Sequence, residues 1–131
     1  AIHGPNGGAQ PESGWLGLVG DETALPVIAR MVEAAPSGTA GTAIIMVRDP
    51  ADAQLIPTNS DISVSWEKMD PDRDPGPLLR ALDPPDSGRF VFFAAEKSQA
   101  RRARDVFREL GLNDKEGKAA GYWTRSSIVA D

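Results

Sequence analysis

The chain has 131 residues, a net charge of −5, 40% hydrophobic residues and 25% charged residues, which is the composition of one globular domain with a sizeable core. The acidic balance argues against a domain that mainly binds a nucleic-acid backbone, so no nucleic-acid partner is expected. There is no cysteine, and His3 is the single histidine. A disulfide framework, a Cys nucleophile, a metal site and a Ser-His-Asp triad are therefore not expected.

The remaining composition bears on location and charge. No apolar run approaches the roughly 20 residues that span a bilayer, and no signal-peptide pattern opens the chain, so we expect no membrane span. The lack of cysteine favours a cytoplasmic location. Only Arg30 and Arg48 are basic in the first sixty residues, and a local basic patch is expected in the second half. A start at Ala1 rather than Met is expected of a fragment of a longer protein.

The first third of the chain predicts a linker, a strand and a helix. Residues 1–14 are rich in Gly and Pro and predict a linker or loop, so the folded domain is expected over 15–131. The apolar run 15–19 predicts a buried strand. A helix is expected over about 23–35, with Thr23 as its N-cap and Pro26 in its first turn.

The rest of the chain alternates strands and helices. Apolar and polar residues alternate in 61–66, which suggests that one face is less buried, as on an edge strand. Gly111 suits the end of the last helix. Strands are expected over 42–48, 61–66, 89–94 and 119–123, a turn or short helix over 49–53, and helices over 77–82 and 98–110. This alternation predicts an α/β fold: a three-layer α/β/α arrangement around a parallel sheet of about five strands.

Ligands of such sheets bind beyond the carboxyl ends of the strands. The segments to inspect are therefore 20–23, 48–49, Trp66, 95–98 and 123–125.

The segment 20–26 passes from a strand through a turn into a helix, where free N–H groups and the helix dipole favour an anion. Gly20 allows a tight turn, and Thr23 offers a hydroxyl. Asp21 and Glu22 would repel a phosphate placed against them. They either act as structural caps or accept hydrogen bonds from ribose hydroxyls or a carboxamide, and the sequence leaves both roles open.

Three motifs carry a family resemblance: Gly-Asp-Glu-Thr-Ala-Leu-Pro at 20–26, Ala94-Ala95-Glu96, and Gly121-Tyr122-Trp123. In order and spacing the chain resembles the C-terminal domain of the siderophore-interacting proteins, a branch of the ferredoxin-reductase superfamily. Residues 4–7 also resemble the run that closes the family's flavin domain. Ala95 stands where the family usually has glycine, and Thr124 stands where arginine is common.

The resemblance implies a ferredoxin-reductase-type nucleotide-binding domain from a flavin-linked ferric-siderophore reductase. NADPH is the implied cofactor, with NADH as the alternative, and FAD would be held mainly by a domain of the same polypeptide that lies upstream. Hydride would pass from the nicotinamide to the flavin, and electrons would then pass to the Fe(III) of a ferric siderophore, with no catalytic acid or base from this chain. The chain alone is expected to be inactive. The alternative is a non-catalytic α/β module that binds a nucleotide or a protein.

The resemblance and the strand ends together predict the cofactor contacts. Arg48, beside Asp49, suits the 2′-phosphate of NADP, whereas Asp49 suits the 2′-hydroxyl of NAD. Lys97 and Arg101 either bind a 2′-phosphate or an anionic siderophore or belong to a solvated helix face. Tyr122 and Trp123 either border the nicotinamide or are core aromatics. The predicted contact residues are Gly20, Asp21, Thr23, Ala24, Arg48, Glu96, Lys97, Arg101, Tyr122 and Trp123.

Overall fold

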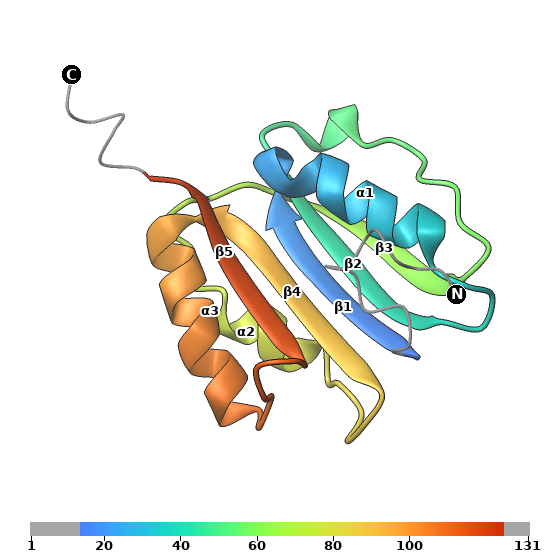
Figure 1. Cartoon of the computed structure of the whole chain (residues 1–131). Helices are drawn as coiled ribbons and strands as arrows, with labels where there is room; N and C mark the ends of the chain where they lie inside the picture. The colour runs from blue at the N-terminus through green and yellow to red at the C-terminus, as the bar shows by residue number, and fades with distance from the viewer. Residues whose placement is uncertain (1–13, 125–131) are drawn as a thin grey trace.

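Five parallel strands form one sheet in the computed structural model, in which residues 14–124 are described (Figure 1). Their order across the sheet is β3-β2-β1-β4-β5. The elements in chain order are β1 (Trp15–Asp21), η2 (Glu22–Ala24), α1 (Leu25–Ala34), β2 (Ala40–Val47), η3 (Pro50–Asp52), β3 (Asp61–Lys68), α2 (Gly76–Ala81), β4 (Arg89–Glu96), α3 (Lys97–Glu109) and β5 (Gly117–Trp123). The predicted parallel sheet of about five strands is confirmed.

The position of each strand follows from its pattern of apolar residues. Residues 16–21, 43–47 and 90–96 are buried without interruption, and the strands that contain them, β1, β2 and β4, occupy the interior of the sheet. A parallel strand covered on both faces needs apolar side chains on both. In β3 most of the even-numbered positions are more buried than their neighbours, and this strand lies at an edge, as its alternation predicted.

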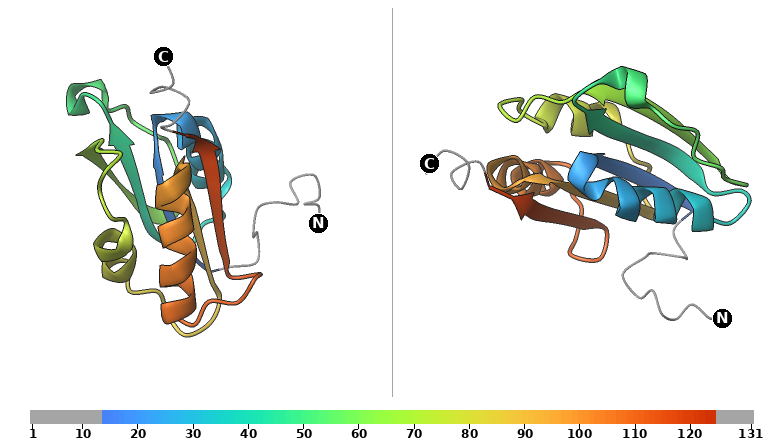
Figure 2. Two further views of the ribbon diagram at one scale, coloured as in Figure 1. Left: turned by 90° about the vertical axis from the view of Figure 1, so that its left-hand side faces the viewer. Right: turned by 90° about the horizontal axis from the view of Figure 1, so that it is seen from above.

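Helices cover both faces of the sheet, so the predicted three-layer arrangement is confirmed. Helix α1 packs on one face, and α2 and α3 pack on the other (Figures 1 and 2). Successive strand residues point to opposite faces, so Leu18 joins the core under α1 while Val19 joins the core under α2 and α3. Burying a side chain of this size contributes about 1.5–3 kcal/mol relative to leaving it exposed.

The register brings the carboxyl ends of the strands to one edge of the sheet. Asp21 of β1 pairs with Met46 of β2, and Gly20 pairs with Ala94 of β4. A bulge then shifts the pairing of β4 with β5, so that Trp123 is the partner of Glu96. Polar residues that lie far apart in the sequence therefore meet along this edge.

The start of the first helix differs from the prediction over 23–35. The chain first forms the short η2 helix, and α1 begins at Leu25, with Pro26 in its first turn as predicted. The expectation that Thr23 is the N-cap was wrong. Asp21 caps η2, and its Oδ1 accepts the Thr23 N–H at 3.0 Å and the Thr23 hydroxyl. A carboxylate at this position satisfies a free helical N–H and also interacts favourably with the helix dipole.

The end of α3 follows the prediction for Gly111. Gly111 has a φ of 77°, and its N–H donates to the carbonyl of Arg108 at 3.1 Å. The Leu112 N–H donates to the carbonyl of Phe107 at 3.0 Å. These two bonds form a Schellman motif, which favours glycine because the residue directly after the C-cap, here Gly111, has a left-handed backbone conformation.

The last points concern membrane-spanning helices and the residues outside 14–124. None of the helices formed within residues 14–124 is long and apolar enough to cross a membrane. The expectations for the linker, for His3 and for the motif at 4–7 fall on residues outside the described part.

Candidate functional site at the carboxyl edge of the sheet

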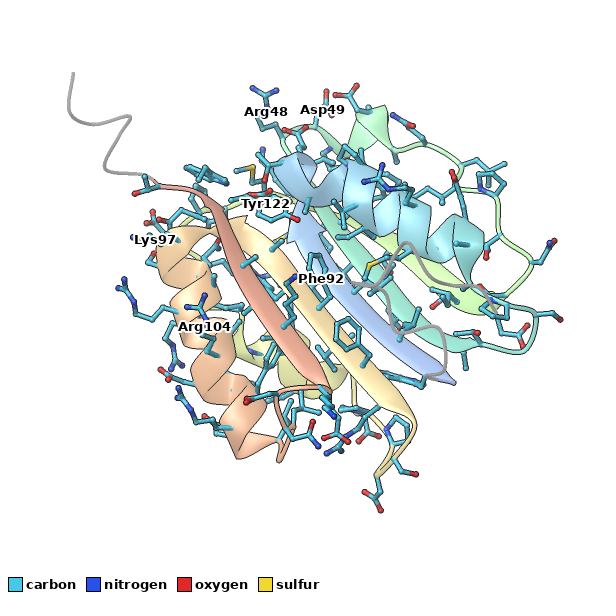
Figure 3. All side chains as sticks on the ribbon, viewed as in Figure 1. Arg48, Asp49, Phe92, Lys97, Arg104 and Tyr122 are labelled. Carbon is cyan, nitrogen blue, oxygen red and sulfur yellow. The ribbon has the colours of Figure 1, made fainter. Side chains whose placement is uncertain are left out.

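Most of the predicted contact residues lie at the carboxyl edge of the sheet. Figure 3 shows Arg48 and Asp49 after β2, Lys97 at the start of α3 and Tyr122 in β5, all toward the same end of the molecule. Trp66 lies within β3 rather than after it, because that strand continues to Lys68. With Asp21 at the end of β1, the edge therefore brings together residues that end or follow β1, β2, β4 and β5.

Asp21 joins two strands that are not neighbours. Its side chain is almost completely buried, and its Oδ2 accepts the Trp123 indole N–H at 2.7 Å. Asp21 ends β1 and Trp123 ends β5, with β4 between them. Its other oxygen is occupied by Thr23. Both carboxylate oxygens of Asp21 are thus hydrogen-bonded to groups of the protein itself, and Thr23 provides two of the three donors.

Glu22 has a different partner. Its Oε1 accepts Arg48 Nε at 2.9 Å, and its Oε2 accepts the Arg48 backbone N–H at 3.3 Å. The Arg48 side chain is 83% exposed. Glu22 therefore holds the arginine through Nε and leaves the outer guanidinium nitrogens toward solvent. Asp49 is the N-cap of η3 and accepts the Ala51 N–H at 3.0 Å.

Gly20 and Ala24 lie in a tightly packed corner. A Cβ on Gly20 would lie 2.7 Å from the carbonyl oxygen of Ala94 and 2.9 Å from both Ala24 Cβ and Ile28 Cδ1. The glycine is therefore needed for the close approach of β4 and α1 to β1. The Ala24 side chain is fully buried, so a ligand could reach this residue only through its backbone.

Glu96 is the N-cap of α3. Its carboxylate accepts the backbone N–H groups of Ser98 at 2.9 Å and of Gln99 at 3.3 Å, and it also accepts the Ser98 hydroxyl. Only 3% of this residue is exposed. The Ala-Ala-Glu motif therefore ends a buried strand with a helix cap.

A pocket of about 410 Å³ lies between the start of α3 and the end of β5. Its lining residues are Lys97, Arg101, Arg104, Gly121, Tyr122, Trp123 and Thr124. A Cβ on Gly121 would lie 2.9 Å from Lys97 Cα, so this glycine lets the helix approach the strand. Four of the predicted contact residues thus share one pocket, whose lining combines cationic and aromatic side chains.

The basic residues of α3 divide into two groups. Arg102 and Arg108 are paired with acidic side chains, and Arg104 donates to the Ala119 carbonyl at 3.0 Å. Lys97 and Arg101 have no hydrogen-bonded or ion-paired partner among residues 14–124. The two unpaired cations both line the pocket.

Arg102 of α3 and Asp74, in the loop before α2, have shifted pKa values, and neither residue lines the pocket. The Gly76 N–H and then the Arg102 guanidinium lower the pKa of Asp74, and the hydrogen bond to Asp74 raises the pKa of Arg102.

Within the described residues, no group of three or more His, Asp or Glu side chains is placed to hold a metal ion.

Four residues near the pocket were not among the predicted contact residues. Arg104, Gly121 and Thr124 line the pocket, and Gln99 donates to the carbonyls of Asp70 at 3.1 Å and Arg73 at 3.0 Å. Helical spacing offered a signal for Arg104, since it follows Arg101 by three residues and Lys97 by seven. Gln99 had no such signal, because its partners lie in a loop more than twenty residues away.

Comparisons with known proteins place the chain in a family. The family model described as Siderophore-interacting protein matches residues 13–126. The uncharacterized proteins Rv2895c of Mycobacterium tuberculosis (strain ATCC 25618 / H37Rv) and Mb2919c of Mycobacterium bovis are each 30% identical over 141 residues, which cover 95% of this chain and 50% of theirs. The chain therefore spans about half the length of the curated relatives that it matches.

Solved structures give the same result. The siderophore-interacting protein SipS from Aeromonas hydrophila matches with a TM-score of 0.75 at 25% identity, over 88% of this chain and 48% of that chain. A siderophore utilization protein from T. fusca matches with a TM-score of 0.72 at 30% identity, over 88% and 47%. The predicted ferredoxin-reductase-type fold is thereby confirmed. Since the family model covers nearly the whole chain, the chain belongs to the siderophore-interacting protein family.

Proposed function

We propose that this chain is the nucleotide-binding half of an NADPH-dependent, flavin-linked reductase that releases iron from ferric siderophores. The observation that carries the proposal is the set of three exposed cations, Arg48, Lys97 and Arg101, which face solvent at the carboxyl edge of an otherwise acidic chain. Parallel α/β sheets bind dinucleotides at this edge. Family membership supplies the link to siderophores.

Arg48 fits the 2′-phosphate of NADPH. It follows β2, where dinucleotide folds bind the adenosine ribose, and Glu22 holds its Nε while the rest of the guanidinium stays exposed. A guanidinium with free Nη groups can bind two phosphate oxygens at once. Asp49 is engaged as a cap, which favours the phosphate over the ribose hydroxyl as the group recognised here.

The pocket beside α3 fits a second anionic group. Lys97 and Arg101 would bind carboxylate, phosphate or hydroxamate oxygens, and Tyr122 and Trp123 would pack against a flat ring. When bound, NADPH would supply the reducing equivalents, and FAD, held mainly outside this chain, would relay them to the chelated Fe(III). The chain's own residues would bind and orient these groups, and no acid or base is required from them.

The test uses the intact polypeptide, with a ferric siderophore and a ferrous chelator as indicator. We expect the purified protein to contain flavin, to oxidise NADPH only when the ferric siderophore is present, and to release Fe(II). We expect residues 1–131 alone to bind NADPH in calorimetry without turning it over. An intact protein that contains no flavin and oxidises no NADPH would favour the non-catalytic binding module instead.

A further inference from the structure

The carboxylate of Asp21 is unusual because it is buried and all its hydrogen-bond donors within residues 14–124 are neutral groups. These donors are the N–H and hydroxyl of Thr23 and the indole N–H of Trp123. A buried ionised carboxylate carries a large desolvation cost unless its hydrogen bonds compensate for it. Capping η2 uses only the Thr23 N–H, so the hydrogen bond from the Trp123 indole is an additional contact that the cap does not require.

The bulge in β5 explains how Trp123 reaches this carboxylate. Ala95 pairs with Gly121, whereas Glu96 pairs with Trp123, so Tyr122 is the additional residue on β5. A bulge of this kind redirects the side chains that follow it. The indole of Trp123 then extends across the end of β4 to Asp21 on β1.

The same indole lines the basic pocket with Lys97 and Arg101. Trp123 ends an edge strand and is only partly buried, so packing restrains its ring less than it would restrain a core tryptophan. A short charge-assisted hydrogen bond at Nε1 restricts the ring to one orientation.

We infer that Asp21 is a positioning residue, which fixes the Trp123 indole as a pre-oriented wall of the basic pocket. A ring or chelate that enters the pocket packs against an aromatic face whose angle is already set, and this lowers the ordering cost of productive binding. The identity of that ligand rests on the proposed function, whereas the fixed indole does not.

The first experiment examines the indole itself in the intact protein. Asp21→Asn keeps the shape but leaves one acceptor oxygen, for which the Thr23 N–H and the Trp123 indole compete, and a neutral amide oxygen binds the indole proton less strongly than a carboxylate does. In ¹H–¹⁵N NMR spectra, with Trp123→Phe used to assign the signal, we expect the Trp123 indole proton to exchange with solvent about tenfold faster in Asp21→Asn. In a background in which Trp15, Trp66 and every further tryptophan of the intact protein are replaced by Phe, time-resolved fluorescence anisotropy of Trp123 should gain a fast component.

Asp70→Asn is the matched control, because Asp70 also accepts a backbone N–H two residues ahead, that of Asp72 at 3.0 Å, but is exposed. It should leave the indole exchange rate and anisotropy unchanged. An Asp21→Asn variant with an unaltered Trp123 signal would overturn the inference, as would an equal change in Asp70→Asn.

The second experiment measures turnover of NADPH with a ferric siderophore. Asp21→Asn and Trp123→Phe should each lower kcat about tenfold with flavin content unchanged, and the double variant should be no slower than either single variant, because both remove one interaction. Unchanged kcat and KM in a variant whose indole is loosened would refute the positioning role. A wild-type protein without turnover would overturn the ligand assignment, while the exchange and anisotropy data would still decide whether Asp21 fixes the ring.

Discussion

Gly20 is the residue at which one added carbon has the clearest expected effect. In Gly20→Ala the new Cβ would meet the Ala94 carbonyl oxygen at 2.7 Å, and backbone in a central strand cannot move away easily. We expect a loss of about 1–3 kcal/mol in the free energy of unfolding, measured by urea denaturation. Gly14→Ala is the control, since no atom lies within 4 Å of its Cβ. Equal urea midpoints for the two variants would show that β4 and α1 can shift to make room for the added Cβ.

Arg48 is the residue on which cofactor choice is expected to depend. Arg48→Ala should raise KM for NADPH about tenfold, because a charge-assisted contact to the 2′-phosphate is lost, and should leave KM for NADH almost unchanged. Steady-state kinetics of the intact protein provide the measurement. Arg30→Ala, an exposed arginine on α1, should alter neither constant. An equal rise for both nucleotides would remove Arg48 from 2′-phosphate recognition.

Single residues were predictable only where their partners are close in the sequence. Pro26 and Gly111 were predicted correctly because a first turn and a helix end depend on local backbone geometry. The roles of Asp21 and Glu22 stayed open because their partners, Trp123 and Arg48, lie 102 and 26 residues away. Local patterns carry no information about such contacts.

At the scale of elements, Gln99 joins α3 to the loop between β3 and α2. Its side chain is buried and donates to two loop carbonyls, those of Asp70 and Arg73. Gln99→Leu would leave both carbonyls without this donor, and we expect a loss of about 1–3 kcal/mol and faster hydrogen exchange over 70–75. Gln54→Leu, at an exposed loop position, should change neither. Unaltered exchange over 70–75 would show that the loop is held by other contacts.

The elements themselves were largely predictable, but their order in the sheet was not. Apolar runs predicted the three strands that the structure places in the interior, and alternation predicted that β3 is an edge strand. The runs in β1, β2 and β4 are alike, since all three are covered on both faces, so hydrophobicity cannot say which is central. The carboxyl ends of β1 and β4 were predicted too short because the polar residues Asp21 and Glu96 continue these strands while capping the next helix.

At the scale of the whole molecule, one arginine, Arg89, connects the loops at the amino end of the sheet. Arg89 begins β4 and donates to the carbonyls of Pro85 at 2.9 Å and Gly111 at 3.0 Å. It also pairs with Glu116 at 3.3 Å, just before β5. The Arg89 side chain is only 11% exposed, so this network ties the loops around β4 at the edge opposite the candidate site.

Acid stability is expected to depend on this network. The Asn113 N–H and then the Arg89 guanidinium lower the pKa of Glu116 below 4.5. A carboxyl whose pKa is depressed in the folded state stabilises the protein above its unfolded pKa, and this stabilisation is lost as the pH falls through the folded pKa. Glu116→Gln should therefore lower the urea midpoint at about pH 7, and the difference from wild type should shrink steadily below about pH 4.5. Glu33→Gln, an exposed carboxylate on α1, should follow the wild-type curve throughout. A wild-type advantage over Glu116→Gln that stayed constant down to about pH 2 would mean that ionisation of Glu116 is not what stabilises the folded chain.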